Sequence, residues 1–240
     1  MFTCFNRSLL TARQFALACL LFLAGICYAQ AGITINGVDD KARQNILAYL
    51  QLDDEPCDAP LWRVRRLFKD AENEIREALE VVGYYHARIE KELVPGGACW
   101  QARFDITPGR PVLLRTVDIE IDSGSEQDEK LLEVVQQCAL RSGDILQHAN
   151  YDRCRRNIHR MAKSRGYFDA RFIERRIDVY PAEFAADISL HFQTGRRYVF
   201  GETTFDQSIM HPDLVRRVVI ASPGQPYDAD ITRRMQRDLI

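Results

Sequence analysis

Cysteine and histidine are the residues of this sequence whose spacing could define a chemical site. Two of each gather in the middle of the chain, at Cys138, His148, Cys154 and His159. Thiolate and imidazole are common protein ligands of zinc. Fifteen residues separate the two cysteines and ten separate the two histidines, and neither spacing is usual for a structural zinc site. A disulfide between the cysteines is therefore the main expectation, and a zinc or free-thiol site is the weaker alternative.

Patterns typical of enzymes and of nucleic-acid-binding proteins do not occur in the sequence. No G-x-S-x-G motif accompanies the serines, and there is no glycine-rich phosphate loop. The formal net charge is −2, and the two arginine clusters are interleaved with acidic residues, as on solvated helix faces; they are Arg63, Arg65, Arg66 and Arg153, Arg155, Arg156. We expect no catalytic activity, no cofactor, no metal and no nucleic-acid partner.

Residues 1–31 have the composition of a secretory signal peptide. A basic start is followed by an apolar run over residues 15–26 and by the small residues Ala29 and Ala31. The run is shorter than the roughly 20 apolar residues that a membrane-spanning helix needs. We expect cleavage after Ala29 or Ala31 and export from the cytoplasm. An uncleaved membrane anchor and a lipoprotein modified at Cys27 are the alternatives.

Three short sequence signals recur in the same order with a period of about 80 residues. The string GYYHARI at 83–89 returns as GYFDARF at 166–172, TPGRPV at 107–112 as QTGRRY at 193–198, and SGD at 142–144 as PGQ at 223–225. The recurrence divides the chain into a first unit at 32–111, a second unit at 112–195 and an incomplete third unit at 196–240. We expect the chain to be a fragment of a longer protein, with a truncated gene as the alternative.

Hydrophobic periodicity predicts the element order β-α-α-β-β in each complete unit. For the first unit it predicts a strand over 33–35, helices over 46–50 and 62–82, and strands over 87–94 and 102–106. For the second unit it predicts a strand over 117–121, a helix over 131–138, a helix that Asn150 caps and Gly166 ends, and strands over 167–180 and 188–193. The third unit starts in the same way, with a helix over 214–220 and another after Tyr227. The expected fold class is α+β, in which each tandem unit covers a three-stranded mixed sheet with two helices.

The division into units also selects a disulfide pairing. Four cysteines remain once the predicted signal peptide is removed, and an even number in an exported chain favours disulfides. Two of them lie in the first unit and two in the second. Pairing within each unit gives Cys57–Cys99 and Cys138–Cys154.

The recurring strings and the order of elements resemble polypeptide-transport-associated (POTRA) domains. The likeness is greatest to the periplasmic arm of the translocation and assembly module family, TamA, and covers residues 33–240. The resemblance implies three POTRA domains ahead of an outer-membrane β-barrel, which is missing from this sequence, and a TamB-like periplasmic partner. It implies a role in outer-membrane assembly, either by inserting barrel proteins such as autotransporters or by moving lipid.

The resemblance also implies an interaction surface, because the strand that follows the second helix of a POTRA domain lies at a sheet edge. In this chain the two edge strands are 87–94 and 170–179. The unpaired backbone groups of an edge strand can bind an added strand from another chain, whereas charged side chains discourage unselective pairing. The second edge is rich in charge, and we expect it to bind a partner selectively through Ala170, Arg171, Phe172, Ile173, Glu174, Arg175, Arg176, Ile177, Asp178 and Val179.

The sequence therefore predicts a non-catalytic docking arm on the periplasmic side of the bacterial outer membrane. Its expected partners are a TamB-like protein and unfolded outer-membrane protein clients, and the missing C-terminal barrel would connect it to the membrane. The alternative is a structural spacer that positions the barrel without binding clients.

Overall fold

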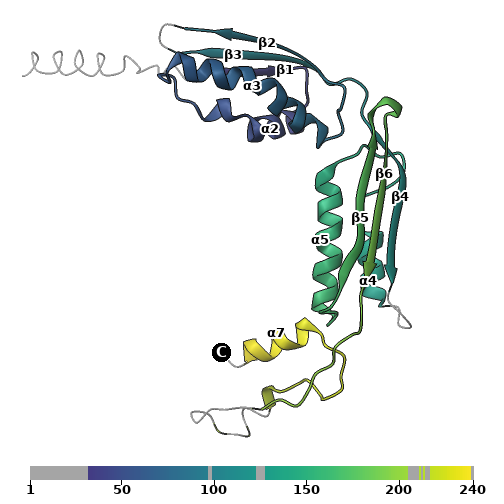
Figure 1. Ribbon diagram of the computed structural model, residues 1–240. Helices are drawn as coiled ribbons and strands as arrows, with labels where there is room; N and C mark the ends of the chain where they lie inside the picture. The colour runs from purple at the N-terminus through teal and green to yellow at the C-terminus, as the bar shows by residue number, and fades with distance from the viewer. Residues whose placement is uncertain are drawn as a thin grey trace, which may run out of the picture.

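The computed structural model describes residues 32–96, 99–122, 128–204, 211, 213 and 217–238 of the 240-residue chain. The predicted signal peptide at 1–31 lies outside the described residues, and so do residues 214–216 of the helix expected over 214–220. The described part consists of two α+β units and a shorter segment that contains the helix α7 (Ala229–Asp238) (Figure 1).

The first unit packs two helices against a three-stranded sheet. Its elements are β1 (Gly32–Asn36), α2 (Asp40–Tyr49), the short 3₁₀ helix η1 (Gln51–Asp54), α3 (Leu61–Glu80), β2 (Arg88–Val94) and β3 (Gln101–Thr107). The strand order is β1-β3-β2, with β1 parallel and β2 antiparallel to the central β3. Both helices lie on the same face of this sheet (Figure 1).

The second unit has the same plan. Its elements are β4 (Leu113–Asp122), α4 (Glu129–Gln136), α5 (His148–Ser164), β5 (Arg171–Tyr180), the 3₁₀ helix η2 (Pro181–Glu183) and β6 (Ala185–Gln193). The strand order is β4-β6-β5, again with one parallel and one antiparallel pair. The predicted α+β class, with three-stranded mixed sheets covered by helices, is confirmed.

Hydrophobic periodicity explains why these segments form these elements. The buried residues of α5 recur at helical spacing, at Tyr151, Cys154, Ile158 and Ala162. The buried residues of β6 alternate along the strand, at Ala186, Ile188, Leu190 and Phe192. These two sets belong to one hydrophobic core, and each unit has a core of its own.

The start of α5 differs from the prediction. The helix begins at His148, so Asn150 lies inside it and does not cap it, and Gln147 is the N-cap residue. The backbone N–H of His148 donates to the carbonyl of Val81 in the first unit, at 3.0 Å. The first N–H groups of a helix have no partner within the helix. Here a carbonyl of the preceding unit accepts from one of them, whereas the sequence predicted a capping side chain, that of Asn150.

Gly83 and Gly166 lie in equivalent surroundings just after α3 and α5. Their φ angles are +97° and +90°, a region that glycine adopts without strain. The carbonyl of Gly83 accepts from the N–H of Val112 at 2.8 Å, and that of Gly166 accepts from the N–H of Tyr198 at 2.9 Å. Each glycine is thus hydrogen-bonded to the beginning of the next unit, as tandem units require. The unit boundaries at 111 and 195 stay predictions.

Side chains reinforce the joint between the first and second units. The hydroxyl of Tyr85 lies 3.1 Å from Nε2 of His148. Burial, with a smaller effect from Glu80, raises the pKa of Tyr85 to about 12, and burial lowers the pKa of His148. The hydroxyl therefore keeps its proton near neutral pH, and the hydrogen bond joins two uncharged groups.

Candidate functional site

The predicted partner-binding residues lie along one edge of the second sheet. Residues 171–179 belong to β5, and Ala170 is buried immediately before it. The strand order gives β5 only one neighbour, β6, among the described residues. The opposite side of the β5 backbone therefore presents N–H and C=O groups that an added strand could pair with.

The other edge of this sheet is less open. At the start of β4, Leu113 forms an isolated antiparallel bridge with Ile145. The N–H of the next residue, Leu114, donates to the carbonyl of Asp144 at 2.8 Å. A stretch of the same chain thus occupies part of the outer side of β4, which leaves β5 as the more accessible edge.

The register with β6 assigns the side chains of β5 to two faces. Opposite the buried residues of β6, and so on the face toward the helices, lie Phe172, Arg175, Ile177 and Val179. On the solvent face lie Glu174, Arg176 and Asp178. A bulge between Phe172 and Glu174 leaves Ile173 without a partner in β6, and its side chain is 59% exposed. Bulges are common in edge strands, where they limit indiscriminate pairing.

On the solvent face, His191 of the central strand joins both edge strands. Its Nε2 lies 2.9 Å from Oδ2 of Asp118 on β4, and its Nδ1 lies 3.2 Å from Oε2 of Glu174 on β5. The hydrogen bond with Asp118 is the main cause that raises the pKa of His191, and nearby carboxylates add to it. Arg176 in turn contacts Glu174 at 3.4 Å and Asp178 at 2.7 Å. The charges on this face of β5 are therefore balanced within the sheet.

The same group contains residues of types that bind metals. One ligand atom from each of Asp118, Glu120 and His191 lies within 4.8 Å of the others. Both ring nitrogens of His191 already contact a carboxylate, which is the arrangement expected of a protonated imidazole donating two hydrogen bonds. A charged histidine between carboxylates accounts for this geometry without a metal ion.

A cavity of about 620 Å³ lies between α5 and β5, on the helix face of the edge strand. Its apolar lining includes Ala170 and Phe172, and the ring of Phe172 packs against that of Phe192 with centroids 4.7 Å apart. The rest of its lining consists of His159 and five arginines, Arg155, Arg156, Arg160, Arg171 and Arg175. We call this cavity, with these residues, the α5–β5 groove.

The sequence did not reveal the groove. The interleaving of Arg155 and Arg156 with acidic residues is typical of a solvated helix face, and the structure instead places both beside an edge strand. The signal that could have found them is their spacing relative to the core of α5. Arg155, Arg156, His159 and Arg160 flank the buried Cys154 and Ile158 on one side of the helix.

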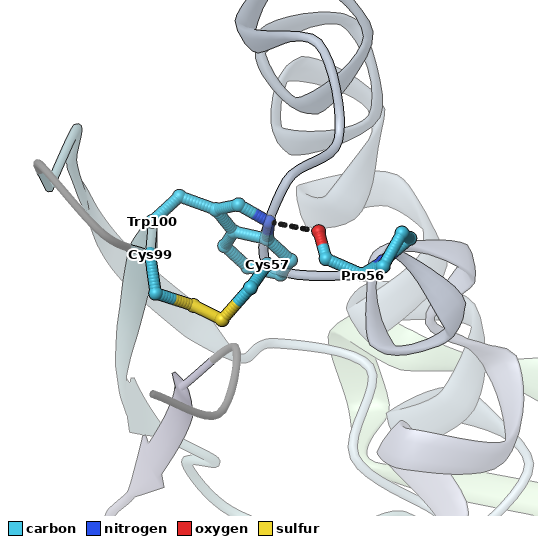
Figure 2. The surroundings of a disulfide bond; sticks show 4 residues. All are labelled: Pro56, Cys57, Cys99 and Trp100. Carbon is cyan, nitrogen blue, oxygen red and sulfur yellow. Dashed lines mark hydrogen bonds between the residues drawn. A yellow bond between two sulfur atoms is a disulfide. The ribbon is translucent and has the colours of Figure 1, made fainter. Parts of the chain in front are cut away.

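Four cysteines form two disulfides, Cys57–Cys99 and Cys138–Cys154, which is the pairing expected from the division into units. Figure 2 shows the first of these beside Trp100, whose Nε1 donates to the carbonyl of Pro56 at 2.9 Å. The indole is almost fully buried, at 3% exposure. The bridge and the buried indole together attach the segment before α3 to the start of β3.

The second disulfide decides between the two expectations for the Cys/His group of the second unit. Cys138 and Cys154 are bonded to each other and leave no thiolate for a metal. His148 hydrogen-bonds to Tyr85, and His159 lines the α5–β5 groove. The structure therefore does not bring these four residues together as a zinc site.

None of the helices within the described ranges is both long enough and apolar enough to cross a membrane.

Comparison with known proteins gives a family match for one part of the chain. Residues 32–108 match the family model described as "POTRA domain TamA domain 1". The match covers the first unit, from β1 through β3.

Solved structures similar to the chain include two POTRA segments and one N-terminal domain. The POTRA3–5 segment of BamA from Haemophilus influenzae is 17% identical, with 88% of this chain and 84% of that chain covered and a TM-score of 0.45. The N-terminal domain of Omp85 from the thermophilic cyanobacterium Thermosynechococcus elongatus is 16% identical, with 88% and 83% covered and a TM-score of 0.34. The POTRA1–3 segment of Omp85 from Anabaena is 12% identical, with 87% and 83% covered and a TM-score of 0.35. The family-model match identifies the first unit as similar to a TamA POTRA domain.

Proposed function

We propose that the chain is a non-catalytic docking arm on the periplasmic side of the outer membrane, belonging to a module that assembles or translocates outer-membrane proteins. The match of the first unit to the TamA POTRA model supports this role. A TamB-like periplasmic protein and unfolded outer-membrane protein clients are the proposed partners. A C-terminal barrel outside this sequence would connect the arm to the outer membrane, and a cleaved signal peptide at 1–31 would export it.

The observation that carries the proposal is the open edge of β5. This strand has ten residues, one sheet neighbour and a cavity beside its helix face. An extended segment that pairs with such an edge gains main-chain hydrogen bonds whatever its sequence, while its alternate side chains meet the neighbouring pocket. This mode of binding suits a protein that must hold many different barrel strands before they fold.

Proline substitution at the edge tests strand addition. Proline lacks the N–H group and is poorly accommodated next to a paired strand. The variant Ile173→Pro lies at the bulge, where β6 provides no partner, so the fold should tolerate it; Ile177→Pro lies on the partly buried face and is the more disruptive variant. We expect Ile173→Pro to weaken binding of a urea-unfolded, fluorescently labelled outer-membrane barrel protein at least tenfold, as measured by anisotropy on dilution from denaturant.

The matched control is Glu90→Pro in β2, the corresponding edge strand of the first unit. It should leave binding within about twofold of the unsubstituted chain, and circular dichroism should show that both variants keep their secondary structure. If folded Ile173→Pro and Ile177→Pro chains bind the unfolded barrel protein as tightly as the unsubstituted chain, docking at β5 is wrong.

A second role, that of a structural spacer, is favoured by a different observation. The same glycine-centred joint occurs after α3 and after α5, and side chains reinforce both copies. Repeated joints of this kind fix each unit against the next, which is what a spacer needs. A spacer would depend on the joints and would be insensitive to substitutions along β5.

A further inference from the structure

The α5–β5 groove carries more positive charge than its own residues neutralise. Arg155 pairs with Asp152 at 3.1 Å. Arg160 and Arg171 donate only to neutral amide oxygens, those of Asn157 and Gln193. Among the residues that the structure describes, the side chains of Arg156 and Arg175 have no hydrogen bond and no ion pair. Within the described residues, the five arginines that line the groove therefore form one ion pair.

The corresponding positions of the first unit carry charges of both signs. The equivalence of Gly83 and Gly166 aligns α3 with α5, so that Glu72 corresponds to Arg155 and Glu77 to Arg160. The edge strands are aligned through the buried residues of the central strands, Phe104 in β3 and Leu190 in β6. Lys91 lies opposite Phe104 and Arg175 lies opposite Leu190, so Lys91 corresponds to Arg175. The first unit thus has acidic residues on the helix where the second has arginines.

In the first unit these side chains close the space between helix and edge strand. Nζ of Lys91 lies 3.6 Å from Oε2 of Glu72 and donates to the carbonyl of Phe68 at 3.2 Å. Arg76 extends from the same helix and donates to the carbonyl of Ala87 at 3.0 Å. The cation of the first edge strand is therefore bound by its own helix.

In the second unit the same positions cannot close in this way. Arg155 and Arg175 are both cations, and His159 stands where the first unit has Arg76. Like charges on facing elements repel each other. At physiological ionic strength, salt largely screens this repulsion only between charges more than about 8 Å apart. An anion placed between α5 and β5 would convert this repulsion into attraction, in the way that Glu72 does within the first unit.

The shape of the groove and its place beside β5 indicate what kind of anion fits. A strand added to β5 would direct every second side chain toward α5, with a spacing of roughly 6.8 Å between them. The groove spans β5 from Arg171 to Arg175, which is long enough for about two such side chains. Guanidinium groups bind carboxylates through paired hydrogen bonds, and the Phe172 ring offers apolar contact for the stems of acidic side chains.

We propose that the α5–β5 groove selects an acidic partner strand, namely an extended protein segment with Asp or Glu at two positions separated by one residue. The inference rests on the proposed docking function and adds to it the chemistry of the partner that this edge prefers. An anionic lipid headgroup would satisfy the arginines but would leave the backbone of β5 unpaired, and the peptide is the ligand that uses both features.

Three ten-residue peptides in the same threonine–valine host test the proposal by fluorescence polarisation with the purified chain. The first has Glu at positions i and i+2, the second has Gln at those positions, and the third has Glu at i and i+1, so that its charge is unchanged but only one carboxylate faces the groove. We expect the first peptide to bind at least tenfold more tightly than the second and about threefold more tightly than the third in 150 mM salt. Equal binding of the first two peptides would overturn the proposal, and equal binding of the first and third would reduce it to unspecific attraction.

Arginine variants locate the effect. The double variant Arg156→Gln/Arg175→Gln removes no side-chain hydrogen bond and no ion pair within the described residues, so it should fold normally. It should abolish the preference for Glu while leaving binding of the Gln peptide unchanged. The matched control is Arg65→Gln/Arg66→Gln, which removes two exposed arginines of α3 and should change nothing. Tighter binding to phosphatidylglycerol vesicles through Arg156 and Arg175, with displacement of the peptide, would assign the groove to lipid and overturn the proposal.

The proline variant separates this inference from the proposed function. If Ile173→Pro weakens all three peptides and the peptides bind equally to the unsubstituted chain, docking at β5 stands and the selection of acidic strands is wrong. If Ile173→Pro leaves the first peptide bound while Arg156→Gln/Arg175→Gln releases it, the preference for acid stands and strand addition is wrong.

Discussion

His191 is the titratable residue that connects all three strands of the second sheet. It contacts Asp118 on β4 and Glu174 on β5, and it lies on β6 between them. Because the pKa of His191 is raised above its usual value in the folded chain, protonation and folding favour each other. The charged form stabilises the sheet below the pKa that the unfolded chain has, about 6.5, and this contribution is lost as the pH rises through the higher pKa of the folded chain.

The substitution His191→Gln tests this coupling. We expect the unsubstituted chain to exceed the variant in free energy of unfolding by more at pH 5.5 than at pH 8, as measured by urea denaturation. The control is His159→Gln, because burial and the charge of Lys163 lower the pKa of His159. In that variant the difference from the unsubstituted chain should change in the opposite direction between the two pH values. A pH-independent effect of His191→Gln would show that its contacts are not those of a charged imidazole.

At the scale of the elements, the end of α3 lies against the second unit at a glycine, where a side chain would be strained and crowded. A Cβ at Gly83 would lie 2.7 Å from the carbonyl oxygen of Leu146 and 2.8 Å from Cγ2 of Ile145, both in the second unit. Its φ of +97° is also unfavourable for any L-residue with a side chain. Helix end and neighbouring unit approach each other so closely because the glycine has no side chain.

The pair Gly83→Ala and Gly143→Ala separates backbone strain from crowding between units. Gly143 has a similar φ of +91°, but an added Cβ there would meet nothing within 4 Å. We expect each variant to lose about 1 kcal/mol or more of unfolding free energy through strain, with a further loss of about 1–3 kcal/mol in Gly83→Ala. Urea denaturation of the two variants measures the difference. Equal losses would mean that the joint adapts to the extra methyl group.

The elements themselves were largely predictable from the sequence, because their cores repeat at helical or alternate spacing. The buried residues of α5 and the alternating Ile188, Leu190 and Phe192 of β6 are examples. The start of α5 was not predictable, because a contact with Val81 of another unit determines it. The bulge at Ile173 is likewise a property of the pairing with β6, which single-strand periodicity does not contain.

The candidate site was predictable only in part, because part of it depends on contacts between elements that lie far apart in the sequence. The resemblance to POTRA domains was enough to place β5 at a sheet edge, and the count of cysteines in each unit was enough to pair them. The charge of the α5–β5 groove was not, because it depends on which arginines of α5 face β5. The contacts of His191 depend in the same way on the register of three strands that lie far apart in the sequence.

At the scale of the whole molecule, a second joint connects the second unit to the segment that contains α7. Arg165, just after α5, contacts Asp128 at 3.0 Å and Asp228 at 2.7 Å. Asp128 also caps α4, where it accepts from the N–H of Lys130 at 3.1 Å. On the other side of Gly166, the ring of Phe168 packs against the rings of Tyr198 and Tyr227. The ion pairs of Arg165 and the rings around Phe168 thus lie on either side of the hydrogen bond from the N–H of Tyr198 to the carbonyl of Gly166.

The substitution Asp228→Asn tests whether the charged group holds this joint. Burial opposes ionisation of Asp228, but the N–H of Asp230 and the charges of Arg165 and Lys130 outweigh it and lower its pKa. Its stabilising contribution is therefore present above the pKa of the unfolded chain, about 3.8, and is lost as the pH falls through the lower pKa of the folded chain. At pH 7 we expect Asp228→Asn to speed amide hydrogen exchange in α7 several-fold while exchange in β6 stays unchanged. The variant and the unsubstituted chain should converge as the pH falls through the lowered pKa of Asp228. A spacer should lose its function with this variant, whereas a docking arm should keep its affinity for peptides that bind β5. Unchanged exchange in α7 at pH 7 would show that the backbone hydrogen bond and the aromatic contacts hold the joint without the ion pair.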